Sequence, residues 1–412
     1  MVTAESSDTH LAGTGLRRGL VVIGIVLTAL SLRSAVTSLG VVLDQVRESL
    51  EISATLAGVI TALPVICFAG FGAVAPALSR RIGEQQVVLV GVIAIVVGLG
   101  ARATAGEPLG FVAGSVLALA GIAVANIVLP SLIKRHFPHR VGLMMGIYSM
   151  SAAASVALPA AVTVPLSDAT GYGWRGGLGS WAVLAAVAVI PWMVLLSTGH
   201  HGTSAVEHDQ PRGCSTAALW RSRTALSLTA FFGLQSLNAY VMMGWLPAIL
   251  TSAGLTSRNA ALMLSVSALI AIPISLALPR IATRRDSQRR YVVAIVAGGL
   301  AGYLGLLLAP AIAPLLWVML LASLHGAFPL AVTLIALRAR EPATATQLSG
   351  FVQSGGYVLA ALGPLAIGAL NDLTTTWTVP LIVLIATLVL ELIVGLIAAQ
   401  PRHVETELAT AR

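Results

Sequence analysis

The sequence has little charge for its length. Only 10% of its 412 residues are Asp, Glu, Lys or Arg, whereas 57% are hydrophobic. An ordinary soluble domain carries about 25% charged residues, which it needs to cover its surface. The composition therefore excludes a water-soluble globular protein. It predicts a chain that lies almost entirely in a lipid bilayer, with no separate soluble domain.

Lysine and cysteine are also scarce. The formal net charge is +8, but Lys134 is the one lysine among 24 basic residues. The arginines form short clusters between apolar runs, as in the cytoplasmic loops of membrane proteins, so we expect no nucleic-acid partner. Cys67 lies in an apolar run and Cys214 in a polar loop, which gives no disulfide framework.

The scarcity of lysine and of paired catalytic groups excludes two further classes of protein. A phosphate-binding loop needs a lysine after glycine, and Lys134 follows Ile133 instead, so an ATP-driven pump cannot be built from this chain alone. No nucleophile with a base and no recognised metal-ligand spacing occurs, so we expect neither an enzyme nor a metal or other cofactor. A channel remains an alternative, but repeated halves favour alternating access.

Long apolar runs separated by charge clusters predict about twelve membrane-spanning helices of about 20 residues or more. The expected all-α membrane fold has its spans near residues 19–43, 53–78, 86–104, 108–133, 141–166, 176–197, 224–250, 258–280, 291–309, 314–337, 345–370 and 377–399.

The distribution of arginine predicts the orientation of these spans. With both termini in the cytoplasm, 19 basic residues lie on the cytoplasmic side, and Arg47, Arg102, Arg175 and Arg258 lie on the other. We therefore expect a multi-pass protein of the cytoplasmic membrane, in contact with lipid and monomeric.

A weak internal repeat divides the spans into two halves. Pro76 with Arg80-Arg81 recurs as Pro279 with Arg284-Arg285, and the small-residue stretch from Gly146 recurs from Gly350, about 204 residues later in each case. Two six-helix halves related in this way are the major facilitator design. The predicted organisation is a cytoplasmic tail (1–18), an N-terminal bundle (19–197), a cytoplasmic linker (198–223), a C-terminal bundle (224–400) and a second tail (401–412).

Several longer motifs resemble one branch of that superfamily, the cyanate and nitroimidazole transporters. They are Leu32-Arg33 with Val36-Thr37-Ser38, "VLPSLIKRHFPHRVGLMMGIYS" (128–149), "GWRGGLGSWAVLA" (173–185), "FFGLQSLNAYVMMGWLP" (231–247) and "QLSGFVQSGGYVLAALGP" (347–364). The resemblance covers nearly the whole chain and implies secondary transport. One segment departs from the superfamily pattern, because residues 79–84 (Ser-Arg-Arg-Ile-Gly-Glu) have no aspartate before the arginines, so the usual cytoplasmic gate cannot be assigned.

Arg33 is the most informative residue of the sequence because it lies near the middle of the first span. A central Arg costs about 2.5–3.5 kcal/mol even on insertion scales, so something must offset that cost. Pairing with a carboxylate is one interpretation, but Glu391 lies on the twelfth span, which should be peripheral, and Asp44 lies at the outer end. The other interpretation is a watery cavity in which the planar guanidinium binds an anion.

Further polar residues fall in the helices that line the cavity in this superfamily, so the resemblance implies a common binding site. Each of them is equally compatible with hydrogen bonding between helices. With Arg33, the candidate substrate-binding residues are Asn126, Tyr148, Gln235, Asn238, Trp245, His325, Gln353 and Tyr357. Gln235, Asn238, Met242 and Trp245 recur at helical spacing and would share one face.

His325 is the candidate for proton coupling, since imidazole titrates near neutral pH; the alternative is a neutral histidine bonded to a neighbouring helix. The leading hypothesis is a secondary transporter of a small anionic or polar solute. The alternative on the same fold is an exporter of neutral nitroimidazole-like or drug-like compounds, in which Tyr148, Trp245 and Tyr357 stack on the solute.

The parse into twelve spans generates a topology prediction. A reporter fused after Arg412, and one inserted near Gly202, should both report the cytoplasm, because an odd number of spans before either point would reverse the alternation of basic loops. A periplasmic signal at either position would contradict the twelve-span arrangement.

Overall fold

The computed structural model describes residues 3–52, 54–197 and 215–410, and its regular structure in those ranges is helical throughout. The first half contains α1 (Thr3–Ser31), α2 (Ser34–Ser49), α3 (Ala54–Ile82), α4 (Glu84–Thr104), α5 (Pro108–His136), the 3-10 turn η1 (Pro138–Arg140), α6 (Val141–Thr170) and α7 (Trp174–Ser197). The second contains α8 (Thr216–Leu219), α9 (Arg223–Ser252), α10 (Ser257–Ala282), α11 (Arg289–Leu308), α12 (Pro314–Leu321), η3 (Ala322–Gly326), α13 (Ala327–Arg338), α14 (Pro342–Thr374), α15 (Thr378–Ala398) and α16 (Val404–Thr410).

These helices confirm the predicted all-α membrane fold. Eleven stretches of the described chain are long and apolar enough to cross a bilayer. The 30-residue helix α9 supplies the remaining predicted span. Two spans are not continuous helices: the first is divided between α1 and α2, and the tenth between α12, η3 and α13.

Three segments predicted as tails or linker are partly helical. α1 already begins at Thr3, α8 lies within the predicted linker, and α16 lies within the last segment. Residues 198–214 of the linker, including Gly202, and Arg412 lie outside the described residues.

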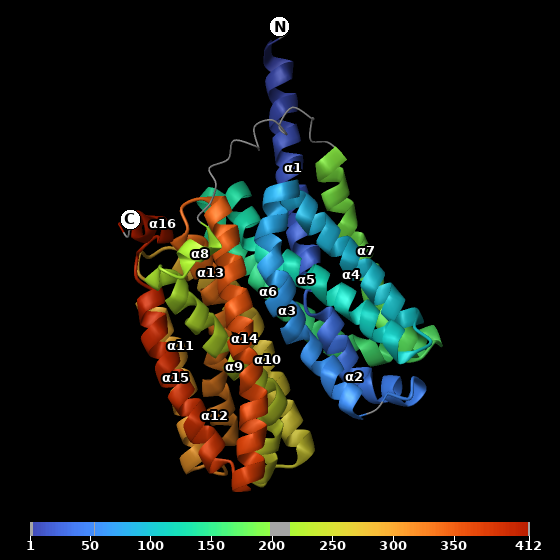
Figure 1. Cartoon of the computed structure of the whole chain (residues 1–412), viewed down its shortest axis with the longest axis vertical. Helices are drawn as coiled ribbons and strands as arrows, with labels where there is room; N and C mark the ends of the chain where they lie inside the picture. Colours follow the sequence, from blue (N-terminus) through green and yellow to red (C-terminus); the bar gives the residue numbers. More distant parts are fainter. Residues whose placement is uncertain (1–2, 53, 198–214, 411–412) are drawn as a thin grey trace.

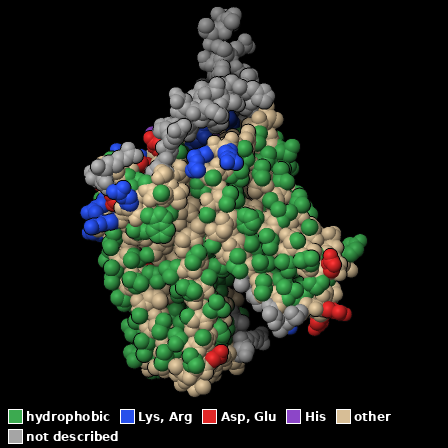
Figure 2. All heavy atoms as spheres, in the orientation of Figure 1, with side chains coloured by type: hydrophobic (Ala, Val, Ile, Leu, Met, Phe, Trp, Pro, Cys, Tyr) green, Lys and Arg blue, Asp and Glu red, His purple; other side chains and the backbone are tan. Residues whose placement is uncertain are grey.

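The surface suits a bilayer: hydrophobic side chains cover the flanks, and Lys and Arg gather at the end of the bundle that carries α16 (Figure 2). We call this end of the molecule the α16 end.

The two halves are separate bundles that meet along a seam. Helices α1–α7 pack on one another, as do α9–α15, and the halves touch through the pairs α3–α14, α6–α10 and α5–α14. The bundles lie close together toward the α16 end and diverge toward the opposite end (Figure 1). The seam is therefore the surface along which one half can rock against the other.

Glycine permits the closest approaches across this seam. A Cβ built on Gly146 of α6 would lie 2.5 Å from the backbone oxygen of Leu276 in α10, and one on Gly350 of α14 would lie 2.5 Å from the Pro76 ring of α3. Small residues let membrane helices pack backbone to backbone, where dispersion contacts are densest. The Gly146 and Gly350 repeat found in the sequence is thus the packing surface between the halves.

Polar contacts add to this closure at the α16 end. One oxygen of Glu84 (Oε1) accepts hydrogen bonds from Ser131 of α5 and Thr346 of α14, both at 2.7 Å. Lys134 donates to the carbonyl oxygens of Ala336, at 2.9 Å, and Ala339. Glu84 and Lys134 therefore link the first half to the second at the α16 end. Glu84 belongs to the segment 79–84, in which the usual cytoplasmic gate could not be assigned from the sequence.

The glycine contacts generate a stability prediction. Gly146→Ala should lower the melting temperature of the purified protein, because the new methyl group meets a backbone oxygen that cannot rotate away, a strain of about 1–3 kcal/mol. Gly70→Ala is the matched control, since a Cβ at Gly70 has no neighbour within 4 Å. Equal melting temperatures for the two variants would show that the seam tolerates a wider spacing.

Candidate functional site

Arg33 lies at the break between α1 and α2. α1 ends at Ser31, α2 begins at Ser34, and Arg33 precedes α2 with φ −119° and ψ −5°. The hydroxyl of Ser34 donates to the carbonyl oxygen of Ser31 at 2.9 Å, and that of Ser31 donates to Leu27 at 3.0 Å. Serine side chains that bond to the local backbone compete with helical hydrogen bonds, so this Ser-Leu-Arg-Ser segment favours a break. The break displaces Arg33 from a regular helical position.

The guanidinium group of Arg33 is surrounded by aromatic side chains from the second half. It lies 5.1 Å from the ring centroid of Phe328 at the start of α13, and beside the hydroxyl groups of Tyr240 on α9 and Tyr357 on α14. Tyr148 of α6 is also close. None of the described carboxylates is paired with it, and Arg33 is partly exposed. Ring faces and hydroxyl oxygens stabilise the cation without neutralising it.

A hydrogen-bonded chain crosses the seam beside Arg33. The Tyr148 hydroxyl donates to the side-chain oxygen of Asn126, whose Nδ2 donates to Gln353 Oε1 at 2.7 Å. Gln353 in turn donates to Ser349 Oγ at 2.8 Å. Asn126 and Tyr148 belong to the first half and Gln353 to the second. This series of hydrogen bonds therefore links the two halves beside Arg33.

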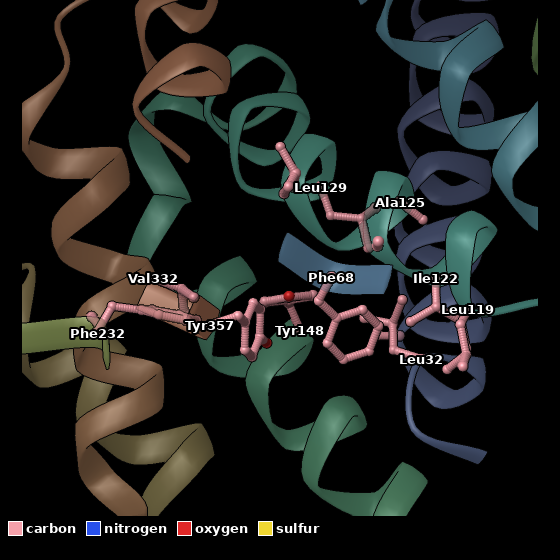
Figure 3. Close-up of a cluster of buried hydrophobic side chains, with 14 of the residues drawn as sticks. Leu32, Phe68, Leu119, Ile122, Ala125, Leu129, Tyr148, Phe232, Val332 and Tyr357 are labelled. Atoms are coloured by element: carbon pink, nitrogen blue, oxygen red, sulfur yellow. The ribbon is translucent and has the colours of Figure 1, made fainter. Parts of the chain in front are cut away.

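Aromatic rings form the wall of the site. The ring of Tyr357 lies 5.1 Å from Phe68 of α3 and 5.2 Å edge-on from Phe232 of α9, and Phe232 lies 6.1 Å from Phe328. Phe68, Tyr148 and Tyr357 lie together in one cluster, with Leu32 on one side and Phe232 on the other (Figure 3). The wall is apolar except for the tyrosine hydroxyl groups, so a solute beside Arg33 would lie among ring faces and edges.

Five of the nine predicted site residues therefore come together: Arg33, Asn126, Tyr148, Gln353 and Tyr357. The other four have partners elsewhere. Gln235 donates to the Phe232 carbonyl oxygen and to Ser236 on its own helix. Trp245 donates to the Pro364 carbonyl oxygen at 3.1 Å and lies 5.7 Å from Trp377.

Asn238 and His325 also bond away from Arg33. Asn238 donates to Glu391 of α15. Gln235, Asn238 and Trp245 therefore each have a different partner, although their spacing places them on one face of α9. A ring nitrogen of His325 lies 2.9 Å from the Ser267 hydroxyl of α10. This arrangement corresponds to the alternative of a histidine bonded to a neighbouring helix.

Sequence reasoning missed Tyr240, Phe328, Phe68 and Phe232 as neighbours of the site. Tyr240 and Phe232 could have been predicted, because both lie in the "FFGLQSLNAYVMMGWLP" segment. Nothing local indicated Phe68 or Phe328, which reach the site from α3 and α13. In the described part of the chain, no three His, Cys, Asp or Glu side chains are grouped so that they could hold a metal ion.

Chemically, the site combines one permanent cation, several hydroxyl groups and flat apolar walls. A guanidinium group can donate two parallel hydrogen bonds to a planar acceptor such as a carboxylate or nitro group. Aromatic faces suit a planar solute and give less to a bulky, strongly hydrated one. Among the residues that the structure describes, no carboxylate lies at the site to attract a cation. Its arrangement therefore favours small planar solutes that carry negative charge or electron-rich oxygens.

Comparison with known proteins identifies the family of the chain. Residues 21–364 match the Major Facilitator Superfamily. The chain is 35% identical over 383 residues to the uncharacterized transporter YycB of Bacillus subtilis (strain 168), covering 92% of this chain and 94% of that one. It is 32% identical over 392 residues to the 2-nitroimidazole transporter of Escherichia coli (strain K12), covering 95% and 98% of the two chains. It is 28% identical over 351 residues to the cyanate transport protein CynX of the same organism, covering 85% and 89%.

A solved structure has the same fold. The proton:xylose symporter XylE superposes with a TM-score of 0.78 at 13% identity, covering 97% of this chain and 99% of that one. At this identity the likeness concerns the fold alone. Taken with the sequence matches, it places the described helices in a known transporter architecture. The chain belongs to the major facilitator superfamily, in the branch that contains the cyanate and 2-nitroimidazole transporters.

Proposed function

We propose that this secondary transporter carries a small planar anion across the cytoplasmic membrane by alternating access, with Arg33 as the group that binds it. The observation that carries the proposal is the environment of Arg33: a partly exposed guanidinium at the seam, beside three tyrosines and without a paired carboxylate among the described residues. A cation in the membrane needs a counter-charge or water, and a bound anion supplies the counter-charge.

The relatives support the choice of a small planar or linear solute. Cyanate and 2-nitroimidazole appear in the names of two of them, and both present electron-rich atoms that can accept hydrogen bonds from a guanidinium. The walls formed by Phe68, Phe232 and Phe328 leave aromatic faces for the rest of the solute. We expect the solute to lie beside Arg33 and Tyr357 and to contact both.

The contacts across the seam support alternating access. In the conformation described, glycine packing, Glu84 and Lys134 hold the halves together at the α16 end. The Asn126–Gln353 hydrogen bond lies beside the solute site, so solute that displaces it would change the balance between closed and open states at that end. In this way the solute itself biases the rocking of the halves.

The orientation that we propose places the α16 end in the cytoplasm. Lys and Arg gather at this end, and basic loops remain on the cytoplasmic side of membrane proteins (Figure 2). We further propose a monomer with the lipid bilayer and a small solute as its partners, without nucleic-acid binding, enzymatic activity or a cofactor.

A second candidate function is export of neutral nitroheterocycles, and a specific observation favours it. Six aromatic residues lie around the site, and two of their contacts, Phe68–Tyr357 and Phe232–Tyr357, have the separation and angle typical of tilted and edge-to-face packing. In that function Arg33 would bind the nitro group, and the parallel N–H donors of the guanidinium group would matter more than its positive charge. His325 remains the proton-coupling candidate derived from the sequence, in contact with Ser267.

Replacing Arg33 distinguishes the two candidate functions. Arg33→Lys keeps the charge but loses the paired N–H donors of the guanidinium group, so cyanate binding should weaken about tenfold. Arg33→Gln should abolish cyanate binding, because a hydrogen bond to a charged group contributes about 1.5–3 kcal/mol. Both variants should insert and fold. The measurement is the shift in melting temperature caused by cyanate or by 2-nitroimidazole.

Arg280→Gln is the control, because Arg280 is exposed near the end of α10 and should respond like the unmodified protein. If Arg33→Gln is stable and still binds cyanate normally, the anion site is wrong and the nitroheterocycle exporter becomes the leading function. If Arg33→Gln unfolds instead, and removal of one acidic residue restores the fold, Arg33 is a structural ion-pair partner.

The tyrosine beside Arg33 offers an independent prediction. Tyr357→Phe removes the hydroxyl group and keeps the ring, so cyanate binding should weaken several-fold while 2-nitroimidazole binding changes little. Tyr291→Phe is the matched control, because the Tyr291 hydroxyl bonds Arg290 and the Ile281 carbonyl oxygen away from the site. Equal affinities of the Tyr357 and Tyr291 variants for cyanate would remove Tyr357 from the proposed site.

A further inference from the structure

A buried carboxyl group lies inside the membrane-spanning region, on the helix that the sequence assigned to the periphery. Glu391 of α15 is fully buried, with 0% of its surface exposed. It faces the interior of the second half, where α15 packs against α9 and α11. A carboxyl group in that position is costly, and intramembrane acids of this kind are usually functional.

The contacts of Glu391 are few and neutral. Its Oε2 accepts a hydrogen bond from Asn238 Nδ2 of α9 at 3.2 Å, and its Oε1 has no hydrogen-bond partner. The amide of Asn238 also lies 3.4 Å from the Thr387 hydroxyl, and its oxygen accepts from Tyr303 of α11 at 3.5 Å. Glu391 therefore has polar neighbours, and none of the described basic side chains pairs with it.

The charged groups on the surrounding helices are directed elsewhere. Arg289 of α11 is exposed and donates to the Leu396 carbonyl oxygen, and Arg338 of α13 donates to Ala398 and Gln288. Asp372 of α14 is exposed near the opposite end. On α9 the facing residue is Asn238, and on α11 it is Tyr303. With one hydrogen bond and no counter-ion, the neutral carboxylic acid is the form that this environment favours.

Helix α9 connects Glu391 to the solute site. Asn238 bonds Glu391, and Tyr240, two residues further along, lies beside Arg33. Two residues correspond to roughly 200° around a helix, so the two contacts lie on nearly opposite faces of α9. Phe232 of the same helix packs against Tyr357. A movement of α9 that changes one contact therefore changes the other.

We propose that Glu391 is the proton-binding site of this transporter and that its protonation is coupled to solute binding at Arg33 through α9. The step is simple: the carboxylate takes one proton from hydronium, leaving water and a neutral carboxylic acid, and later returns the proton to water on the other side. Release requires water to reach Glu391, so the α9–α15 contact must loosen in another conformation. This inference rests on the proposed transport function, which it extends by naming the coupling group.

The first experiment replaces the carboxyl group by an amide of the same shape. In proteoliposomes, Glu391→Gln should reduce the uptake of radiolabelled cyanate driven by a pH gradient at least tenfold. Exchange of cyanate across the membrane without a gradient should stay within about twofold, because the amide mimics the protonated acid. Glu391→Asp, which still titrates, should recover part of the gradient-driven uptake.

Asp372→Asn is the matched control, because Asp372 is an exposed carboxyl group on α14, near the end opposite the α16 end. It should keep gradient-driven uptake. Gradient-driven uptake that persists in Glu391→Gln would overturn the proposal, and so would its loss in His325→Gln alone.

A second measurement does not depend on the solute. The infrared difference spectrum between the unmodified protein and Glu391→Gln at neutral pH should show the carbonyl stretch of one protonated carboxylic acid, shifted by exchange into heavy water. Absence of this band would overturn the inference even if cyanate is transported. Presence of the band in a protein that transports neither cyanate nor 2-nitroimidazole would support a protonated Glu391 and count against the proposed function alone.

Discussion

The unneutralised guanidinium group of Arg33 is the constraint on which the centre of the molecule depends. A cation inside a bilayer must be hydrated, paired or surrounded by electron-rich groups. Here Phe328 and the hydroxyl groups of three tyrosines surround it, and no carboxylate among the described residues pairs with it. These neighbours reduce the cost of burial without cancelling the charge. In the function that we propose, this remaining charge attracts the anion, and the break between α1 and α2 places it at the seam.

The seam itself combines two kinds of contact with different consequences. Glycines such as Gly146 and Gly350 bring backbones together, and such packing is lost all at once when the helices separate. Hydrogen bonds such as Asn126–Gln353 are directional and can exchange with a solute or with water. Packing therefore defines the closed arrangement at the α16 end, and the polar bridge makes its stability depend on what occupies the site. A transporter needs both properties, because a seam that was only tight would not respond to its cargo.

Helix α9 has a central place in this arrangement. One face meets the solute site through Phe232 and Tyr240, and another meets Glu391 through Asn238. The two ionisable groups of opposite sign thus lie on different sides of the same helix and do not neutralise each other. Direct pairing of Arg33 with Glu391 would have satisfied both charges and left neither available to a ligand. Their separation is consistent with one group for the solute and another for a proton.

The sequence alone determined the membrane class, the all-helical fold and the transporter family, because hydropathy, arginine distribution and long motifs are properties of the chain read in order. It also predicted Arg33, Asn126, Tyr148, Gln353 and Tyr357 as site candidates, since polar residues in long apolar runs stand out, and the structure brings these five together. Only the tertiary structure decided which of the candidates meet: Asn238, Trp245, Gln235 and His325 are directed to other partners. Phe328 reaches Arg33, and Phe68 reaches Tyr357, from distant helices. The burial of Glu391 was equally hidden, because helical spacing shows which residues share a face but not which neighbour that face will meet.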